Sequence, residues 1–274
     1  MLSFLNYLIS GISLGSIYAI IALGYTMVYG IAKMLNFAHG DFIMVGGYAI
    51  FTCMITLGLN PFLSILIAMG VCLLIGVGTE KIAYKPLREA GSPLAVLITA
   101  IGVSYLLENL ALLIFGSNPK SFTSVVSWSG LTLAGGQLKI QGVTIVTILV
   151  SMAVLLVLQW FVHGTREGQA MLAVSQDRGA ATLMGINVNH TISLTFAIGS
   201  ALAAVAGALL CSAYPTLTPY TGAMIGGIVL GVIEILARTY ISSQLSDAIV
   251  CGILVIVLLV KPTGILGKNI QEKV

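Results

Sequence analysis

Charged side chains are scarce in this chain of 274 residues. Asp, Glu, Lys and Arg together make up 8% of it, whereas 58% of its residues are hydrophobic. Soluble domains carry about 25% charged residues, so this composition excludes a soluble protein. The formal net charge of +3 is too small to indicate nucleic-acid binding. We therefore expect a protein embedded in a lipid bilayer.

Motifs for nucleotide and metal binding are also missing from the sequence. No G-x-x-x-x-G-K-[ST] segment occurs, so the chain has no P-loop, and any ATP hydrolysis must belong to a separate subunit. The cysteines stand singly in apolar stretches, and their spacing indicates neither a zinc site nor a disulfide framework. They are Cys53, Cys72, Cys211 and Cys251. We expect neither a cofactor nor an enzyme activity.

Long apolar runs dominate the sequence instead. Seven runs are long enough, or nearly so, to cross the hydrocarbon of a bilayer, which takes about 20 residues. The connecting loops are too short for a second domain. The sequence predicts one all-α domain over residues 1–274, a transmembrane helical bundle of about eight segments, of which the short one is a crossing or a re-entrant element. The runs are Leu8–Val28, Phe62–Val77, Leu94–Phe115, Val143–Val162, Ile192–Cys211, Met224–Leu236 and Ala248–Val260, with the short one at Phe42–Leu57.

Positive charges predict which loops face the cytoplasm. Cytoplasmic loops carry an excess of Lys and Arg, so we expect residues 164–190 to be a cytoplasmic loop and residues 116–142 an external one. The external loop contains extended segments around a Gly135-Gly136 turn signal, which predicts a hairpin. This hairpin either caps the bundle or contacts a binding protein. The basic residues behind the assignment are Lys81, Lys85, Arg88, Arg166 and Arg178.

A short helix is predicted within the cytoplasmic loop, at Asp177–Asn187. Asp177 can cap its first turn by accepting a backbone N–H, and Gly185 can adopt the left-handed conformation that closes the last turn. Two alanines allow a partner to approach closely, and two apolar side chains on the same side form a ridge. We predict a docking surface; an ordinary helical loop is the alternative. The assigned residues are Asp177, Arg178, Ala180, Ala181, Leu183, Met184 and Gly185.

Two groups of polar residues interrupt the apolar runs. Polar atoms at membrane depth need partners or a water-filled cavity, so both groups are candidates for lining a solute path. His39 and Asp41 alone do not make a metal site, because a tetrahedral site needs more ligands. The first group could instead lock neighbouring helices or form a loop at the membrane surface, and Glu108 could hydrogen-bond within the bundle. The candidate residues are Asn36, Phe37, His39, Asp41, Glu108 and Asn109.

Four separated motifs, in this order, resemble the LivH-type permeases of branched-chain amino acid ABC importers. They are Leu35–Asp41, Asp177–Asn187, the small-residue run Ile198–Leu209 and the tail Lys261–Gly267. The spacing Ala180-Ala181-x-x-x-Gly185 resembles the coupling motif of such permeases. The resemblance implies a second related permease subunit, two cytoplasmic ABC ATPase subunits and an external substrate-binding protein as partners, in a bacterial inner membrane.

The resemblance implies transport of Leu, Ile or Val, although members of the wider group also carry urea and short amides. A secondary transporter or channel is an alternative class, which needs coupling-ion ligands or repeated discontinuous helices near the midplane. The sequence offers only Glu108 and Asn36–Asp41 for that role. A purely structural membrane subunit explains the scarcity of charge but not the capped cytoplasmic helix.

The chain departs from the family pattern near Met224. Family members continue there with a Gly- and Ala-rich apolar segment of about one span. Here the two flanks are fused, which suggests an internal deletion that impairs the pore. The charges agree, because eight crossings leave the tail with Lys261, Lys268 and Lys273 outside, against the positive-inside rule.

Overall fold

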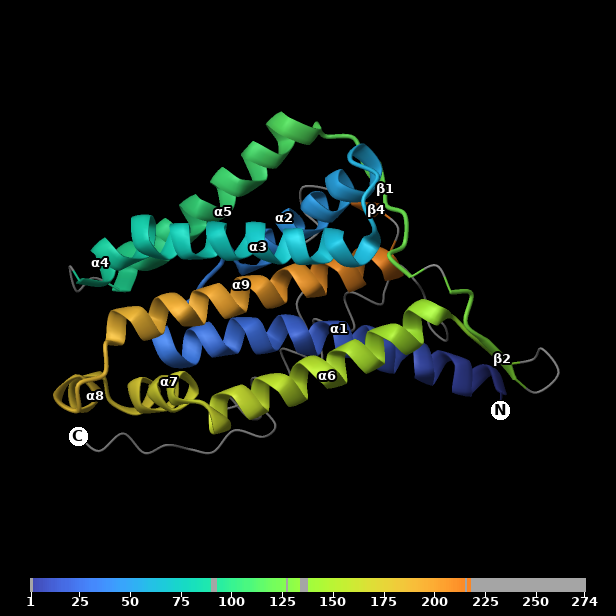
Figure 1. Ribbon diagram of the computed structural model, residues 1–274. Helices are drawn as coiled ribbons and strands as arrows, with labels where there is room; N and C mark the ends of the chain where they lie inside the picture. Colours follow the sequence, from blue (N-terminus) through green and yellow to red (C-terminus); the bar gives the residue numbers. More distant parts are fainter. Residues whose placement is uncertain (1, 90–92, 127, 134–137, 215, 218–274) are drawn as a thin grey trace.

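The computed structural model describes residues 2–89, 93–126, 128–133, 138–214 and 216–217 (Figure 1). Five helices within them are long and apolar enough to cross a membrane, which confirms an all-α polytopic membrane protein. The predicted spans Met224–Leu236 and Ala248–Val260, the fusion near Met224 and the tail motif lie outside the described residues. The long helices are α1 (Leu2–Ala32), α3 (Pro61–Thr79), α5 (Pro93–Phe115), α6 (Gly142–Gly164) and α9 (Val188–Ala213).

Shorter elements connect the long helices. They are α2 (His39–Phe51), the π-helical segments η1 (Thr52–Thr56) and η2 (Glu80–Tyr84), α4 (Lys85–Glu89), α7 (Arg166–Gln176) and α8 (Arg178–Leu183). The strands are β1 (Lys120–Ser121), β2 (Leu131–Leu133), β3 (Leu138–Ile140) and β4 (Thr216–Leu217). Antiparallel pairing of β2 with β3 confirms the predicted hairpin. The pairing of β1 with β4, which sets Lys120 opposite Leu217, was not predicted.

Helix α9 is the centre of the bundle and packs against α1, α2 and α3 (Figure 1). In its most apolar membrane-length stretch 72% of the residues are buried, whereas in the corresponding stretches of α5 and α6 the share is 11%. Small residues in α9 explain this position, because they let neighbouring backbones approach. A Cβ added at Gly207 would lie 2.6 Å from the carbonyl oxygen of Ile43, and one at Gly46 would lie 2.7 Å from Cα of Ala204. The two helices α2 and α9 therefore touch backbone to backbone.

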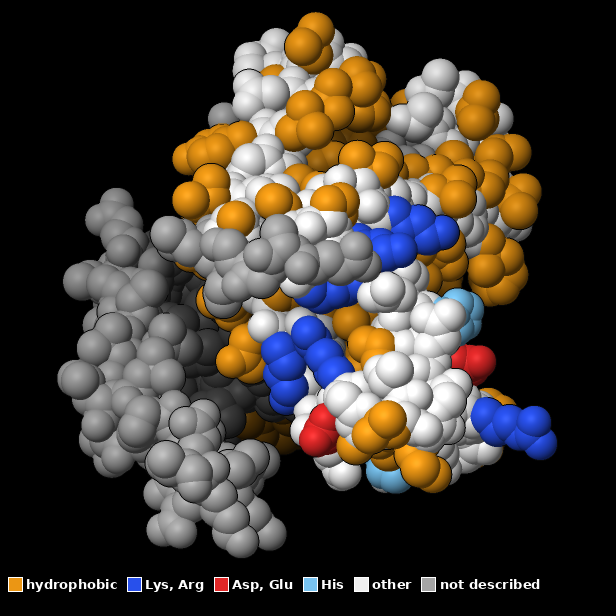
Figure 2. Space-filling view, turned by 90° about the vertical axis from the view of Figure 1, so that its left-hand side faces the viewer, with side chains coloured by type: hydrophobic (Ala, Val, Ile, Leu, Met, Phe, Trp, Pro, Cys, Tyr) orange, Lys and Arg blue, Asp and Glu red, His pale blue; other side chains and the backbone are white. Residues whose placement is uncertain are grey.

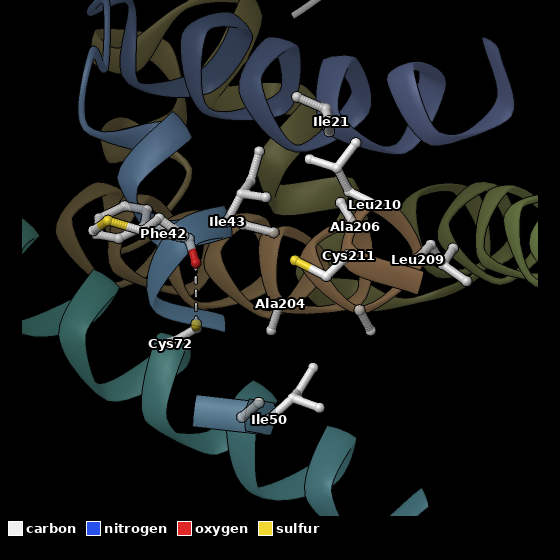
Figure 3. Close-up of a cluster of buried hydrophobic side chains, with 14 of the residues drawn as sticks. Ile21, Phe42, Ile43, Ile50, Cys72, Ala204, Ala206, Leu209, Leu210 and Cys211 are labelled. Carbon is white, nitrogen blue, oxygen red and sulfur yellow. Dashed lines mark hydrogen bonds between the residues drawn. The ribbon is translucent and has the colours of Figure 1, made fainter. Parts of the chain in front are cut away.

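Helix α2 is the short segment predicted at Phe42–Leu57, and it lies inside the bundle, with most of its residues buried. Figure 3 shows Phe42 and Ile43 of α2 in a cluster with residues of α9, among them Ala206 and Leu210. The Cys72 thiol of α3 donates a hydrogen bond to the Phe42 carbonyl oxygen at 3.4 Å. Cys53, Cys72 and Cys211 are buried and unpaired, as expected for core positions.

The two ends of the bundle differ in composition. Helices α4, α7 and α8 lie at one end, together with the last turn of α1, whereas all four strands lie near the other end (Figure 1). We call the first the basic end and the second the hairpin end. The basic residues at the basic end are Lys33, Lys81, Lys85, Arg88, Arg166 and Arg178.

Alanine substitutions at two glycines of α3, one facing α9 and one facing open space, test how closely α3 approaches α9. A Cβ at Gly76 would lie 2.6 Å from Cβ of Ser200, whereas nothing lies within 4 Å of a Cβ at Gly70. We expect Gly76→Ala to destabilise the protein by about 1–3 kcal/mol through overpacking. Gly70→Ala should be neutral or stabilising by up to about 1 kcal/mol, because alanine is the better helix former. Thermal unfolding in detergent measures both, and equal midpoints for the two variants would contradict the packing described here.

Candidate coupling surface and polar interior

The structure confirms the short capped helix predicted in the loop before α9. The Asp177 carboxylate accepts a hydrogen bond from the Ala180 N–H at 3.0 Å and so caps α8. Gly185 has φ +83°, the left-handed conformation that glycine adopts without strain. With Gly185 in that conformation, Gly185 N–H donates to the Thr182 carbonyl and Ile186 N–H to the Ala181 carbonyl, each at 3.0 Å. This pair of bonds is a Schellman motif, which ends the helix sharply.

The residues of α8 divide into an outer and an inner set. Leu183 and Met184 are 90% and 82% exposed, and Asp177, Ala180 and Gly185 are exposed as well. Ala181 is buried, so the expectation that both alanines face a partner is corrected for this residue. A helix presents residues to opposite sides within one turn, and Ala181 falls on the side that packs against the bundle. The outer surface of α8, defined by Ala180, Leu183, Met184 and Gly185, is small and apolar.

Arg178 belongs to the inner set and holds α8 against α1. Its Nη2 donates to the carbonyl oxygen of Ile31 at 3.3 Å and also to that of Ala32. These carbonyls end α1, where the helix dipole favours a cation. Burial, and then the positive charge of Arg88, lower the pKa of Arg178 from its usual value, yet an arginine keeps its charge in proteins. The last turn of α1 is therefore fixed to α8 by a charge-assisted contact.

Figure 2 faces the basic end of the molecule, and Lys and Arg side chains gather on it. Helix α7, which precedes α8, is the polar element of this surface. Its N-cap is Thr165, whose side chain accepts from the Gly168 N–H at 3.0 Å. Met171 and Val174 turn inward, toward a buried cluster that includes Ala181 and Phe196. The loop thus forms a compact unit seated on the ends of α1 and α9.

The polar stretch between α1 and α2 lies largely inside the protein. Asn36, His39 and Asp41 are each at most 6% exposed, whereas Phe37 is 49% exposed. The Asn36 side-chain oxygen accepts a hydrogen bond from the Tyr84 hydroxyl at 2.9 Å. Asn36 Nδ2, His39 Nε2 and Asp41 Oδ2, however, are buried and have no hydrogen-bond partner in the part of the chain that the structure describes. Burying polar atoms without hydrogen bonds costs free energy in an apolar interior, so these atoms are candidates for contact with a ligand or water.

The two candidate residues of α5 behave differently from one another. Glu108 is half-buried and lies within electrostatic range of Asp41, which also lies beside Ser104. Asn109 is exposed, and its side-chain amide donates to the Tyr105 carbonyl oxygen at 2.7 Å within α5. The structure thus brings Glu108 toward the α2 polar group, while Asn109 satisfies its amide on its own helix.

A groove of about 460 Å³ lies between α6 and α9, next to Met69 of α3. The described residues that line it are all apolar, including Val154, Phe161 and Leu202. Binding sites for polar ligands contain a few convergent polar groups, and such groups are absent from this lining. The described lining therefore offers a polar ligand no convergent hydrogen-bonding side chains.

Glu80 is a buried residue that the sequence reasoning missed. It is fully buried in η2, where one carboxylate oxygen lies 3.1 Å from Arg88 Nη1 and the other accepts from the Ser193 hydroxyl at 2.6 Å. The sequence does hold a sign of this ion pair: one acidic residue ends the apolar run of α3, and an arginine follows two turns later. The contact with Ser193 of α9 could not be predicted in this way, because serine is common in membrane helices.

Comparison with known proteins gives consistent matches. Residues 7–222 match the family described as branched-chain amino acid transport system / permease component. The chain is 38% identical to the high-affinity branched-chain amino acid transport system permease protein LivH of Salmonella typhimurium, over 100% of this chain and 98% of the relative. It is 37% identical to BraD of Pseudomonas aeruginosa, over 99% and 98%, and 26% identical to a probable LivH of Methanocaldococcus jannaschii, over 90% and 88%. No solved structure matches the chain significantly.

The alignment with LivH of Salmonella typhimurium is longer than the chain itself. It extends over 307 positions, whereas the chain has 274 residues, so at least 33 aligned positions have no residue here. That difference exceeds the roughly 20 residues of one membrane span. The family match also stops at residue 222, two positions before Met224.

The exposure pattern between α1 and α2 gives a labelling prediction. We expect Phe37→Cys to react with a water-soluble thiol reagent, because this side chain is exposed, and Ala38→Cys to resist, because Ala38 is fully buried. In membranes that contain the ATPase subunits, ATP should change the two rates. Mass spectrometry of the labelled protein measures them. Equal protection of both cysteines, with and without ATP, would mean that these residues only pack.

Proposed function

Because the chain belongs to the family of branched-chain amino acid transport system permease components, we propose that it is a membrane-spanning subunit of a binding-protein-dependent ABC importer for Leu, Ile and Val. The single observation that carries this proposal is the match to named permeases along the whole chain. The subunit acts in the bacterial inner membrane with a second related permease, two cytoplasmic ATPase subunits and an external binding protein. ATP is hydrolysed by the ATPases, since this chain has no P-loop.

The basic end faces the cytoplasm in this proposal, in accordance with the positive-inside rule. The outer surface of α8 then points toward the ATPase, and its two large apolar side chains, Leu183 and Met184, enter a groove on that subunit. Exposed apolar side chains that project beyond a polar helix such as α7 favour a protein contact, because they gain free energy when buried.

The solute path runs beside α2 in this proposal, past Asp41, His39 and Glu108. An amino acid crosses as a zwitterion, and its ammonium group needs acceptors such as carboxylate oxygens. Oδ2 of Asp41, which has no hydrogen-bond partner among the described residues, and Glu108 in electrostatic range support that assignment. Asn36 and Phe37 border the path on its cytoplasmic side, and Asn109 borders it from α5.

The unaligned positions are assigned to the junction near Met224. The chain then lacks one membrane-crossing or re-entrant segment, and its transport is impaired relative to permeases that keep it. The length difference of 33 positions and the end of the family match at residue 222 support this placement.

Charge placed on the outer surface of α8 tests the docking role. We expect Leu183→Asp and Met184→Asp each to weaken binding of the ATPase at least tenfold, which corresponds to about 1.4 kcal/mol. The cause is loss of an apolar contact without disturbance of the fold, since both side chains are exposed. Binding of the purified ATPase to the permease complex in nanodiscs measures the effect.

A matched control is Leu131→Asp, which changes an exposed leucine in β2 at the hairpin end. This variant should bind the ATPase like the unmodified chain. Unchanged affinity of both α8 variants would remove the proposed docking surface.

A reporter tests the missing segment. We expect an enzyme that is active only in the cytoplasm, fused after Val274, to be inactive in this chain and active in a full-length relative, because one crossing fewer places the tail outside. The same fusion after Gln176 should be active in both proteins and serves as the control. An active reporter at Val274 in this chain would mean that one of the assigned spans does not cross.

A further inference from the structure

A cluster of four side chains around the buried Glu80 joins the end of α3 to the start of α9. Glu80 bonds to Arg88 and Ser193 as described above, and Arg88 Nη2 donates to the Asn189 side-chain oxygen at 2.7 Å. Both carboxylate oxygens and two arms of the guanidinium are therefore used. Glu80 and Arg88 come from η2 and α4, whereas Asn189 and Ser193 come from the first turns of α9. Paired and hydrogen-bonded in this way, the charges form a stiff connection.

The α9 side of this cluster is tied closely to α8. Only Met184 to Asn187 separate the two helices, and Asn187 caps α9 by accepting from the His190 N–H at 3.0 Å. The connection between them includes the Schellman turn at Gly185, which fixes its direction. A force on α8 consequently reaches Asn189 and Ser193 through a short piece of backbone, in which the N–H groups of Met184, Gly185 and Ile186 are hydrogen-bonded.

The other side of the cluster leads to the polar stretch before α2. Tyr84 lies in the same π-helical segment as Glu80, and its hydroxyl donates to Asn36 at 2.9 Å. Tyr84 is fully buried and stands against Phe196 of α9, with ring centroids 5.6 Å apart. π-Helical turns often occur at functional sites. A shift of η2 relative to α9 therefore moves the residue that holds Asn36.

From this continuous chain of contacts we infer that Glu80 and Arg88 are positioning residues that transmit movement of α8 to the Asn36 turn. The inference rests on the proposed docking role of α8. Arg178 joins α8 to α1 directly, so the Glu80 cluster supplies the second attachment, toward α3 and α2. Neither Glu80 nor Arg88 contacts the solute or the ATPase in this arrangement. Their bonds to Asn189 and Ser193 make η2 move together with the start of α9.

Two conservative variants test the inference in the assembled importer. Arg88→Lys keeps the charge but not the planar fork that reaches Glu80 and Asn189 together. Ser193→Ala removes one hydrogen bond to Glu80 and leaves the ion pair intact. In proteoliposomes we expect both variants to bind the ATPase and hydrolyse ATP like the unmodified complex, while leucine uptake per ATP falls at least tenfold for Arg88→Lys and severalfold for Ser193→Ala. The ATP-dependent change in Phe37→Cys labelling should also be lost.

Ser175→Ala is the matched control, because the Ser175 hydroxyl donates to the Leu172 carbonyl oxygen within α7. It should leave uptake and labelling unchanged. The inference is overturned if Ser193→Ala keeps normal uptake per ATP and a normal labelling change, whatever the stability of Arg88→Lys. Failure of the docking role is a separate result, since it shows in the ATPase affinity of Leu183→Asp and Met184→Asp.

Discussion

The fold depends on how closely three helices approach α9. Lipid is as apolar as the side chains it surrounds, so membrane helices associate through close packing and hydrogen bonds rather than through hydrophobic burial. In this chain the packing is supplied by small residues on both sides, such as Gly76 against Ser200 and Gly46 against Ala204. Helix α2 can lie inside the bundle, against α9, only because small residues face each other at these points.

Two groups of polar side chains lie near α9: the Glu80 cluster at the basic end, and Asn36, His39 and Asp41 at the start of α2. The first group is fully paired, which suits a rigid connection. The second contains atoms of His39 and Asp41 that have no hydrogen-bond partner within the described part of the chain, in keeping with the proposed solute path. The two groups meet through Tyr84 and Asn36.

Local features of the site could be predicted from sequence, and long-range ones could not. The caps of α8 follow from Asp177 and Gly185, whose effects act within one turn. The inward orientation of Ala181 depends on how α8 sits on α1 and α9, which the sequence of the loop does not state. Glu80 and Ser193 are 113 positions apart in the chain, and the strands β1 and β4 are too short to carry a pairing signal.

We propose that an ATPase acts on this subunit at the outer surface of α8. Photo-cross-linking tests this most directly, with a benzophenone amino acid in place of Leu183 in membranes that contain both ATPase subunits. We expect a cross-link to an ATPase from position 183 and none when the same amino acid replaces Leu131 at the hairpin end. A chain that assembles normally but gives no ATPase cross-link at position 183 would contradict it.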